Sequence, residues 1–330
     1  MVTSKDEFTM PRYKANLIEK FWEYGRTEFG LCDDYFDRPL ASKDRPPVFK
    51  REQASRNVLL KDAILKPVST EVLNAIPEGK RHKWFGSMAS SQALTQSVFG
   101  NLMAYRKLDC LRALVGDDAK PLFIRDSEHG SKCQLEFEVD YMGEESRGRT
   151  MLDVLFNGNH RIAVECKLTE PEVRSCSRPR LRPSDPSYGE QFCDGRYAVQ
   201  LRRSLRCSLS EIGVRYWSYI PDLFDWSAEI DHDPCPLTST YQLVRNLLAV
   251  CVDPTGGVKL DSGHVVMLYD ERNPAFQREG KGITAWNKVR AGLKKQSLMQ
   301  KCTWQEIVTC LRADDTLDWL ATGLSRKYGF

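Results

Sequence analysis

Three stretches in the middle of the chain show the spacing of polar and apolar residues that is typical of β-strands. Residues Gln134 to Tyr141 alternate strictly between apolar side chains and mostly acidic ones, which predicts a strand with one buried face. Thr150 to Phe156 predicts a second strand, and Arg161 to Leu168 predicts a third. The turn signal NGNH at residues 157–160 separates these two, so the pattern predicts a β-hairpin.

Helical spacing lies on both sides of these strands. Residues 88 to 115 place apolar side chains on one face, and Ser90 or Ser91 is positioned to cap the start of this helix. Tyr241 to Val252 predicts a strongly apolar helix, and His264 to Tyr269 predicts a fourth strand. The pattern therefore predicts an α/β fold in the order helix, three strands, helix, strand.

The remaining segments divide the chain around this core. Residues 1–80 are predicted to be an N-terminal extension that is partly helical, over Ala15 to Tyr24. Residues 81–330 are predicted to be one domain with a loop-rich insertion at about 171–235. From about residue 275 onward we expect a C-terminal cap of two or three helices.

Composition and hydropathy indicate the cellular compartment in which we expect the protein. It has 330 residues, of which 41% are hydrophobic and 28% are charged, as in an ordinary globular protein. No apolar run is long enough for a membrane-spanning helix, and the N-terminus lacks an apolar signal segment. We therefore expect a cytoplasmic protein with no membrane partner. The net charge of +3 is too small to indicate a partner by itself.

The 11 cysteines are an odd number without a tight repeat, which predicts reduced thiols rather than a disulfide framework. Cys176, Cys193, Cys207 and Cys235 belong to the insertion. They lack the Cys-x-x-Cys pair that is typical of zinc and iron–sulfur sites, and their spacing leaves open whether they bind a metal.

The candidate chemistry centres on Asp153 and on the segment Glu165-Cys166-Lys167. Because side chains alternate across a strand, Glu165 and Lys167 are expected on the same face of the third strand. Asp153 shares that face only if the hairpin pairs residues whose numbers sum to 318, as 153 and 165 do. That register requires a loop of three or five residues, whereas a loop of two or four would turn Asp153 to the other face unless a bulge or kink turned it back.

This set of residue types suits metal-assisted hydrolysis of a phosphodiester. Asp153 and Glu165 can bind Mg²⁺, for which Mn²⁺ can substitute, through hard oxygen ligands. The metal would activate water, and Lys167 can position that water or offset charge in the transition state. The competing interpretation is an exposed salt bridge between Glu165 and Lys167. The apolar strands on both sides and the acid on the preceding strand argue against it.

The same residues resemble the active-site signature of the PD-(D/E)XK nuclease superfamily. The resemblance rests on TMLD at residues 150–153 and IAVECK at 162–167, with Leu152 in the place of the usual proline. It implies a restriction-endonuclease-like core of helix, three strands, helix and strand. Further segments, from about His82 to the C-terminus, resemble a bacterial branch of restriction-type endonucleases, which implies a role in bacterial defence. These segments are SSQAL at 90–94, CPL at 235–237, YQLVRN at 241–246, YDERNP at 269–274 and KYG at 327–329.

Other polar residues are candidates to complete the site. A further catalytic acid is expected from the first strand, and Glu138 is favoured over Glu136 because it is nearer the strand end. Two groups of residues are candidates for DNA contact. The first group is the polar stripe that Gln242, Arg245 and Asn246 form at helical spacing, which Gln92 could join from the first helix. The second group belongs to a basic C-terminal segment and comprises Lys288, Arg290, Lys294 and Lys295. The bland alternatives are an exposed stripe and a solvated basic surface.

The prediction is thus a Mg²⁺-dependent nuclease, most simply a restriction-type endonuclease that hydrolyses DNA. Cutting both strands of a duplex favours a homodimer. The alternative is a non-catalytic nucleic-acid-binding protein on a nuclease-like fold.

Overall fold

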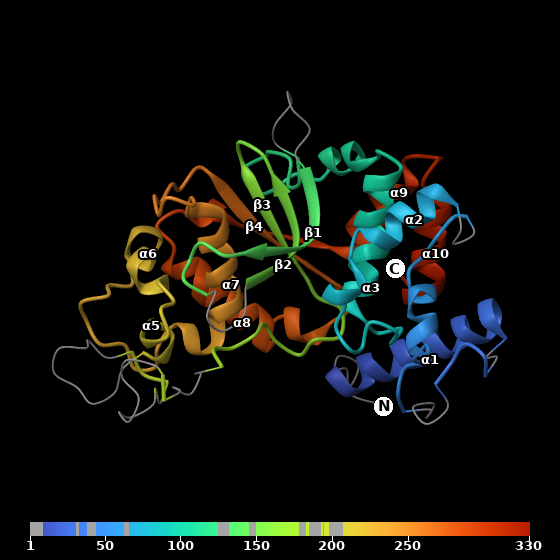
Figure 1. Ribbon diagram of the computed structural model, residues 1–330, viewed down its shortest axis with the longest axis horizontal. Helices are drawn as coiled ribbons and strands as arrows, with labels where there is room; N and C mark the ends of the chain where they lie inside the picture. Colours follow the sequence, from blue (N-terminus) through green and yellow to red (C-terminus); the bar gives the residue numbers. More distant parts are fainter. Residues whose placement is uncertain are drawn as a thin grey trace, which may run out of the picture.

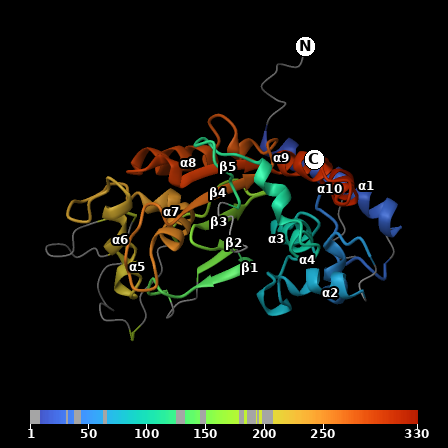
Figure 2. The same ribbon diagram turned by 90° about the horizontal axis from the view of Figure 1, so that it is seen from above.

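The computed structural model describes residues 9–30, 33–37, 44–62, 66–124, 132–144, 150–177, 183–184, 193, 195–197 and 207–330. These residues form a mixed α/β fold in which one central sheet lies between two groups of helices (Figures 1 and 2).

The central sheet has five strands in the order β1-β2-β3-β4-β5. The first three pair antiparallel, and β3, β4 and β5 pair parallel. The strands are β1 (Lys132–Val139), β2 (Thr150–Asn157), β3 (Arg161–Cys166), β4 (Gly263–Tyr269) and β5 (Met299–Thr303). The four strands predicted from the sequence are therefore present, with ends shifted by a few residues.

The expectation that the chain is entirely helical beyond about residue 275 is wrong, because β5 pairs with β4 there. This strand is short, and its sequence MQKCT has no apolar alternation. Gln300 is nonetheless buried, and its side-chain oxygen accepts a hydrogen bond from the backbone N–H of Asp117 at 3.0 Å. A strand whose buried side chain is polar, with a partner this distant in the sequence, cannot be recognised from the hydrophobic pattern.

The hairpin between β2 and β3 has the register that the candidate site requires. Leu155 pairs with Ala163 and Phe156 pairs with Ile162, so the paired numbers sum to 318. The connection is the three-residue loop 158–160, and this prediction is confirmed.

Helices of one group pack on the face of the sheet that carries Ala163 and Val265. A parallel pair of strands needs a crossover connection, and α7 lies in the crossover from β3 to β4 and contacts both strands. The helices of this group are α5 (Ser208–Glu211), α6 (Tyr216–Leu223), α7 (Leu237–Cys251) and α8 (Lys281–Gly292).

The second group covers the opposite face, which carries Val164 and Val266. It includes α1 and α10, which come from opposite ends of the chain and pack against each other (Figure 2). The group comprises α1 (Met10–Phe29), α2 (Pro67–Asn74), α3 (Ser91–Thr95), α4 (Asn101–Ala104), α9 (Trp304–Arg312) and α10 (Asp318–Tyr328).

The helix predicted over residues 88–115 is shorter than expected. A π-helical turn (Gln96–Gly100) joins α3 to α4, and the helix ends where Arg106 takes a positive φ of 55°. The side chain of Ser90 accepts a hydrogen bond from the backbone N–H of Ala93, so the predicted cap at Ser90 is confirmed. Within the described residues, no helix combines the length and apolar character that crossing a membrane requires.

Candidate active site

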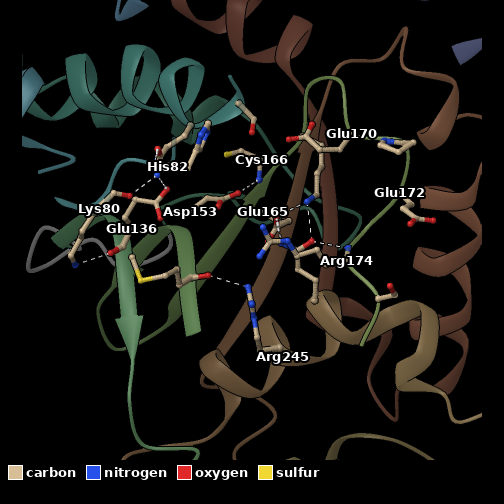
Figure 3. A pocket seen from close by; sticks show the side chains of 17 residues that line it. Lys80, His82, Glu136, Asp153, Glu165, Cys166, Glu170, Glu172, Arg174 and Arg245 are labelled. Atoms are coloured by element: carbon tan, nitrogen blue, oxygen red, sulfur yellow. Dashed lines mark hydrogen bonds and ion pairs between the residues drawn. The ribbon is translucent and has the colours of Figure 1, made fainter. Parts of the chain in front are cut away.

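A cavity of about 580 Å³ opens between β1, β2, the end of β3 and the helices α3 and α7 (Figure 3). Asp153, Glu165 and Lys167 all line it. Its wall also includes Lys80, His82, Ser91, Gln92, Glu136, Met151, Cys166, Glu170, Pro171, Glu172, Arg174, Ser175, Gln242 and Arg245. The hairpin register therefore brings the three predicted residues to one hollow.

Asp153 is fixed against the end of β3. Its Oδ2 accepts a hydrogen bond of 2.7 Å from the backbone N–H of Cys166, the residue between Glu165 and Lys167. The Cys166 side chain lies in the apolar cluster on the other face of the sheet, as strand alternation requires. The carboxyl group of Asp153 is thereby held beside the Glu165–Lys167 pair.

Glu165 is 1% exposed, and helix α7 supplies the donors that satisfy it. Its Oε1 accepts a hydrogen bond from Nε2 of Gln242 at 2.7 Å, and its Oε2 accepts one from Nδ2 of Asn246 at 2.7 Å. The Nζ of Lys167 lies 2.9 Å from the same Oε1. A carboxylate offers about four acceptor positions, so these three donors leave about one for a further partner.

Lys167 is held on two sides. Its Nζ donates to Oε1 of Gln242 at 2.9 Å as well as to Glu165, and its backbone oxygen accepts a hydrogen bond from Nε1 of Trp304 at 2.9 Å. An ammonium group has three protons. Two are used within the protein, which leaves one for a substrate or a water molecule.

Burial and charge shift the pKa values of these groups in different directions. Burial raises the pKa of Asp153 well above its usual value, and the negative charges of Glu165 and Glu136 raise it further. Burial alone would also raise the pKa of Glu165, but the charges of Lys167 and Arg245 outweigh it and the pKa is lowered. Burial alone would lower the pKa of Lys167, but the charge of Glu165 outweighs it and the pKa is raised. The pair therefore stays ionised, and a cation bound nearby would favour the ionised form of Asp153 as well.

Glu136, and not Glu138, faces the cavity, so the preference for Glu138 requires correction. Glu138 lies outside the cavity lining, and its Oε1 forms an ion pair with Nζ of Lys80 at 3.2 Å. Glu136 lies between Leu135 and Phe137, whose partners on β2 flank Asp153, and it has a positive φ of 48°. This left-handed backbone conformation interrupts the alternation of side chains along β1. As a result, Leu135 packs on one face of the sheet and Phe137 packs on the other. Burial raises the pKa of Glu136, although the hydrogen bond from Gln92 opposes this.

The polar stripe of α7 faces the site, so its interpretation as an exposed stripe is wrong. Gln242, Arg245 and Asn246 are all buried. The two amides are occupied by Glu165 and Lys167, and the guanidinium of Arg245 donates to the backbone oxygen of Met151 at 3.0 Å and contacts Asn246 Oδ1 at 3.3 Å. The amides therefore position the acid and the lysine.

Comparison with known proteins identifies the family of the chain. A model of the family described as "Restriction Endonuclease associating with ARP" matches residues 19–329. The chain belongs to this family. No curated protein and no solved structure matched this chain. Membership of the REase-ARP family indicates a nuclease-related role.

In this REase-ARP chain the predicted basic segment lies away from the cavity, since none of its four residues lines it. Three of them are engaged within the protein: Arg290 with Asp117 at 2.7 Å, Lys294 with the backbone oxygen of Pro221, and Lys295 with Asp261. Lys288 is exposed on α8. Trp286 and Trp304, which flank the segment, are buried in the core.

Sequence reasoning missed several residues that line the cavity. Lys80 and His82 precede α3, while Glu170 and Arg174 follow β3. The backbone N–H of Arg174 donates to Oε1 of Gln242 at 3.0 Å. The available signal was the set of charged residues Glu170, Glu172 and Arg174, which follows Lys167 within seven positions.

Across the part of the chain that the structure describes, no group of three or more His, Cys, Asp or Glu residues is arranged to hold a metal ion. Among the insertion cysteines, the backbone N–H of Cys193 donates to Oγ of Ser208, next to Cys207, and that of Cys235 donates to the backbone oxygen of Gly195. Their segments are adjacent, but they do not form such a group.

Proposed function

We propose that this chain is a metal-dependent nuclease of the PD-(D/E)XK type that hydrolyses phosphodiester bonds of DNA, as a restriction-type endonuclease would. The observation that carries the proposal is the convergence of Asp153, Glu165 and Lys167 in one cavity, with Glu165 and Lys167 almost fully buried. Burying an acid and an amine with so many dedicated donors is expensive, and a catalytic role is the simplest reason for it.

The donor set fits Mg²⁺. Mg²⁺ is commonly bound through one or two carboxylates, with water and substrate phosphate completing its shell, and Asp153 and Glu165 would be those two ligands. The raised pKa of Asp153 supports this assignment, because a carboxyl group crowded by other acids gains most from a bound cation. When bound, the ion supplies an activated water molecule and polarises the phosphate.

Lys167 would act as a charged donor and not as a general base. Its pKa is raised, so it keeps its proton at neutral pH. Its remaining N–H would hydrogen-bond to the attacking water or to a phosphate oxygen that gains charge in the transition state. Gln242 and Asn246 would hold Glu165 and Lys167 in place while the substrate binds.

The order of elements supports the same proposal. From α3 to β4 the chain runs through the short helices α3 and α4, the strands β1 to β3, the helices α5 to α7 and the strand β4, a sequence of elements that contains the order that the resemblance to the superfamily implies. The family match over residues 19–329 points to the same class of enzyme.

A cleavage assay on plasmid and linear DNA tests the proposal. We expect cleavage with Mg²⁺ or Mn²⁺ and none with EDTA. Lys167→Ala, Asp153→Asn and Glu165→Gln should each lower the rate by roughly 10²–10³-fold. Lys61→Ala, which removes an exposed lysine outside the cavity, is the matched control and should cleave normally.

The rival function predicts a different pattern. A protein that binds DNA but never cleaves it, and whose binding is unaffected by Lys167→Ala, would be a non-catalytic nucleic-acid-binding protein. Cleavage of RNA alone would contradict the assignment to DNA. Cutting both strands at one position would be expected of a homodimer, which light scattering on the DNA complex would detect.

A further inference from the structure

Trp84 exposes a large aromatic side chain close to the candidate active site. It is 48% exposed, and it is the only aromatic among the exposed large hydrophobic residues that the structure describes. Exposing an indole to water costs free energy, and tryptophan is enriched at interfaces, where a partner covers the ring.

The backbone that carries Trp84 is held in place by buried contacts. The N–H of Trp84 donates to Nδ1 of His82 at 3.0 Å, and the oxygen of Trp84 accepts from the N–H of Ser87 at 2.9 Å. The fully buried Asn57 donates through Nδ2 to the backbone oxygens of Phe85 and Ser87 at 2.7 and 2.6 Å. Since the turn is already ordered, a ligand that stacks on the indole would lose little free energy in ordering it.

The same turn forms part of the wall of the candidate active site. His82 lines both the catalytic cavity and a neighbouring cavity of about 490 Å³ that Trp84 lines. Gln92 ties the turn to the acidic residues, because its Oε1 accepts from the N–H of His82 at 3.0 Å and its Nε2 donates to Glu136 at 2.6 Å. The label of His82 in Figure 3 marks this edge of the catalytic cavity.

The separation suits a nucleic acid strand that crosses both cavities. Trp84 lies two residues from His82, so their Cα atoms are at most about 7.6 Å apart. Bases in one strand of a duplex are about 3.4 Å apart. A base on the indole would therefore lie within a few nucleotides of a phosphate in the catalytic cavity.

The cavity that Trp84 lines carries charges of both signs, because Asp37 and Glu78 line it beside Arg51, Arg81 and Lys83. The Nζ of Lys83 lies 5.3 Å from the centre of the Trp84 ring, and the exposed Arg51 lines the same cavity. Arg81 is not available in the same way, because its guanidinium donates to the backbone oxygens of Leu73 and Ile76. Cationic side chains beside an exposed aromatic ring are the usual features of proteins that bind single-stranded nucleic acid.

We propose that the turn around Trp84 is a subsite for an unpaired base of the DNA substrate. The indole stacks on the base, while Lys83 and Arg51 contact adjacent phosphates. Bases inside an intact duplex are already stacked on both sides, so the subsite selects DNA with a single-stranded or displaced nucleotide next to the cut position. This inference rests on the proposed nuclease function, because it names the substrate of that same site.

Binding assays without metal ions test this inference separately from catalysis. The full chain is titrated, in EDTA, into fluorescently labelled single-stranded DNA and into the matching duplex, and anisotropy is measured. Trp84→Ala should weaken binding of the single strand by about 5-fold to 100-fold, which corresponds to the loss of one stacked base. Binding of the duplex should change by less than about two-fold.

Three control variants separate stacking from other effects of the substitution. Trp84→Phe keeps an aromatic face and should retain most of the affinity, whereas Trp84→Leu keeps apolar bulk without a π-face and should behave like Trp84→Ala. Ile230→Ala removes another exposed hydrophobic side chain and should have no effect.

Equal losses on both DNA forms, or an unchanged affinity of Trp84→Ala for the single strand, would overturn the inference. An effect confined to RNA would contradict the assignment to DNA. Absence of cleavage together with an intact effect of Trp84 would remove the nuclease proposal and leave the base-binding site standing.

Discussion

At the scale of single residues, the site depends on the amides that surround Glu165. Each amide of α7 presents its NH₂ group to the carboxylate, and Gln242 also presents its oxygen to Lys167. This arrangement fixes which atom faces which, because an amide reversed by rotation would set two acceptors against each other. Residues that orient a metal ligand typically change metal affinity or activity by 10–100-fold when they are altered.

Gln242→Glu tests this positioning role with almost no change in shape. The new carboxylate can still accept from Lys167 but can no longer donate to Glu165, so two negative charges meet where a hydrogen bond was. We expect the rate of DNA cleavage at saturating Mg²⁺ to fall by about 10–100-fold. The Mg²⁺ concentration for half-maximal activity should change as well.

Gln300→Glu is a matched control for this variant, because Gln300 is a buried amide outside the cavity. It should lower the melting temperature without changing the requirement for Mg²⁺. If both variants changed only stability, Gln242 would have no role in positioning the site.

The sequence was sufficient to predict that Asp153, Glu165 and Lys167 meet in one place and insufficient to choose among their neighbours. Asp153, Glu165 and Lys167 follow from strand alternation and one hairpin register, which are both local properties. The choice between Glu136 and Glu138 depends on a positive φ at Glu136, and nothing in the strict alternation of that segment indicates a break. Whether the stripe on α7 faces the cavity or water depends on packing between distant segments.

At the scale of secondary structure elements, the position of α7 over the sheet depends on a close approach at the start of β4. A Cβ atom at Gly263 would lie 2.5 Å from the backbone oxygen of Arg161 and 2.8 Å from Cβ of Val250. Arg161 begins β3 and Val250 lies near the end of α7. Glu165 lies on β3, Gln242 and Asn246 lie on α7, and β4 pairs with β3. These three elements therefore meet at a position with no room for a side chain.

Gly263→Ala should destabilise the protein by about 1–3 kcal/mol, because the added methyl group must push apart backbone atoms that cannot repack. Gly79→Ala is the matched control, since nothing lies within 4 Å of its added Cβ and Gly79 is exposed. That substitution should be neutral or stabilise by up to about 1 kcal/mol. Urea unfolding followed by circular dichroism measures both, and equal stabilities would contradict the close approach.

Elements were predictable where their pattern is strong. The helix α7 and the strands β2 to β4 are mostly apolar over their lengths, which is a strong signal for buried elements. In contrast, β5 has a buried glutamine in place of an apolar residue. The helix over residues 88–115 was predicted too long because its pattern continues past Arg106, where the backbone turns.

At the scale of the whole molecule, the two ends of the chain support the segment that follows Lys167. The hydroxyl of Tyr13 on α1 lies 2.7 Å from the backbone oxygen of Leu168 and 2.9 Å from Oδ2 of Asp270. Asn273 also donates to the backbone oxygen of Leu168, at 2.8 Å. Helix α10 packs against α1 from the other end of the chain. Contacts across such sequence separations cannot be derived from local spacing, and they link the folding of both termini to the geometry of the site.

Lys327 on α10 makes this link dependent on pH. Its side chain is buried beside Asn57, and Nζ donates to Oδ1 of that residue at 2.7 Å. Burial lowers the pKa of Lys327 to about 7, whereas an unfolded lysine has a pKa of about 10.4. Between these two values the unfolded chain binds one proton more than the folded chain. The free energy of unfolding should therefore rise with pH across this interval, by up to about 1.4 kcal/mol per pH unit.

Comparison with Lys327→Met isolates this contribution, because the other titrating groups are shared and their effects cancel in the difference between the two proteins. The variant loses the hydrogen bonds to Asn57 and should be less stable than the wild type at high pH. Below about pH 7 the lysine is charged in both states of the wild type, so the difference between the proteins should be constant there. Above it, the difference should grow in favour of the wild type until about pH 10. Urea unfolding at intervals from pH 6 to pH 9.5 measures this slope.

A difference that stays constant over the whole range would mean that Lys327 titrates in the folded protein as it does in water. The contact between α10 and the N-terminal region would then be open to solvent. The two ends of the chain would support the segment that follows Lys167 less firmly than their packing indicates.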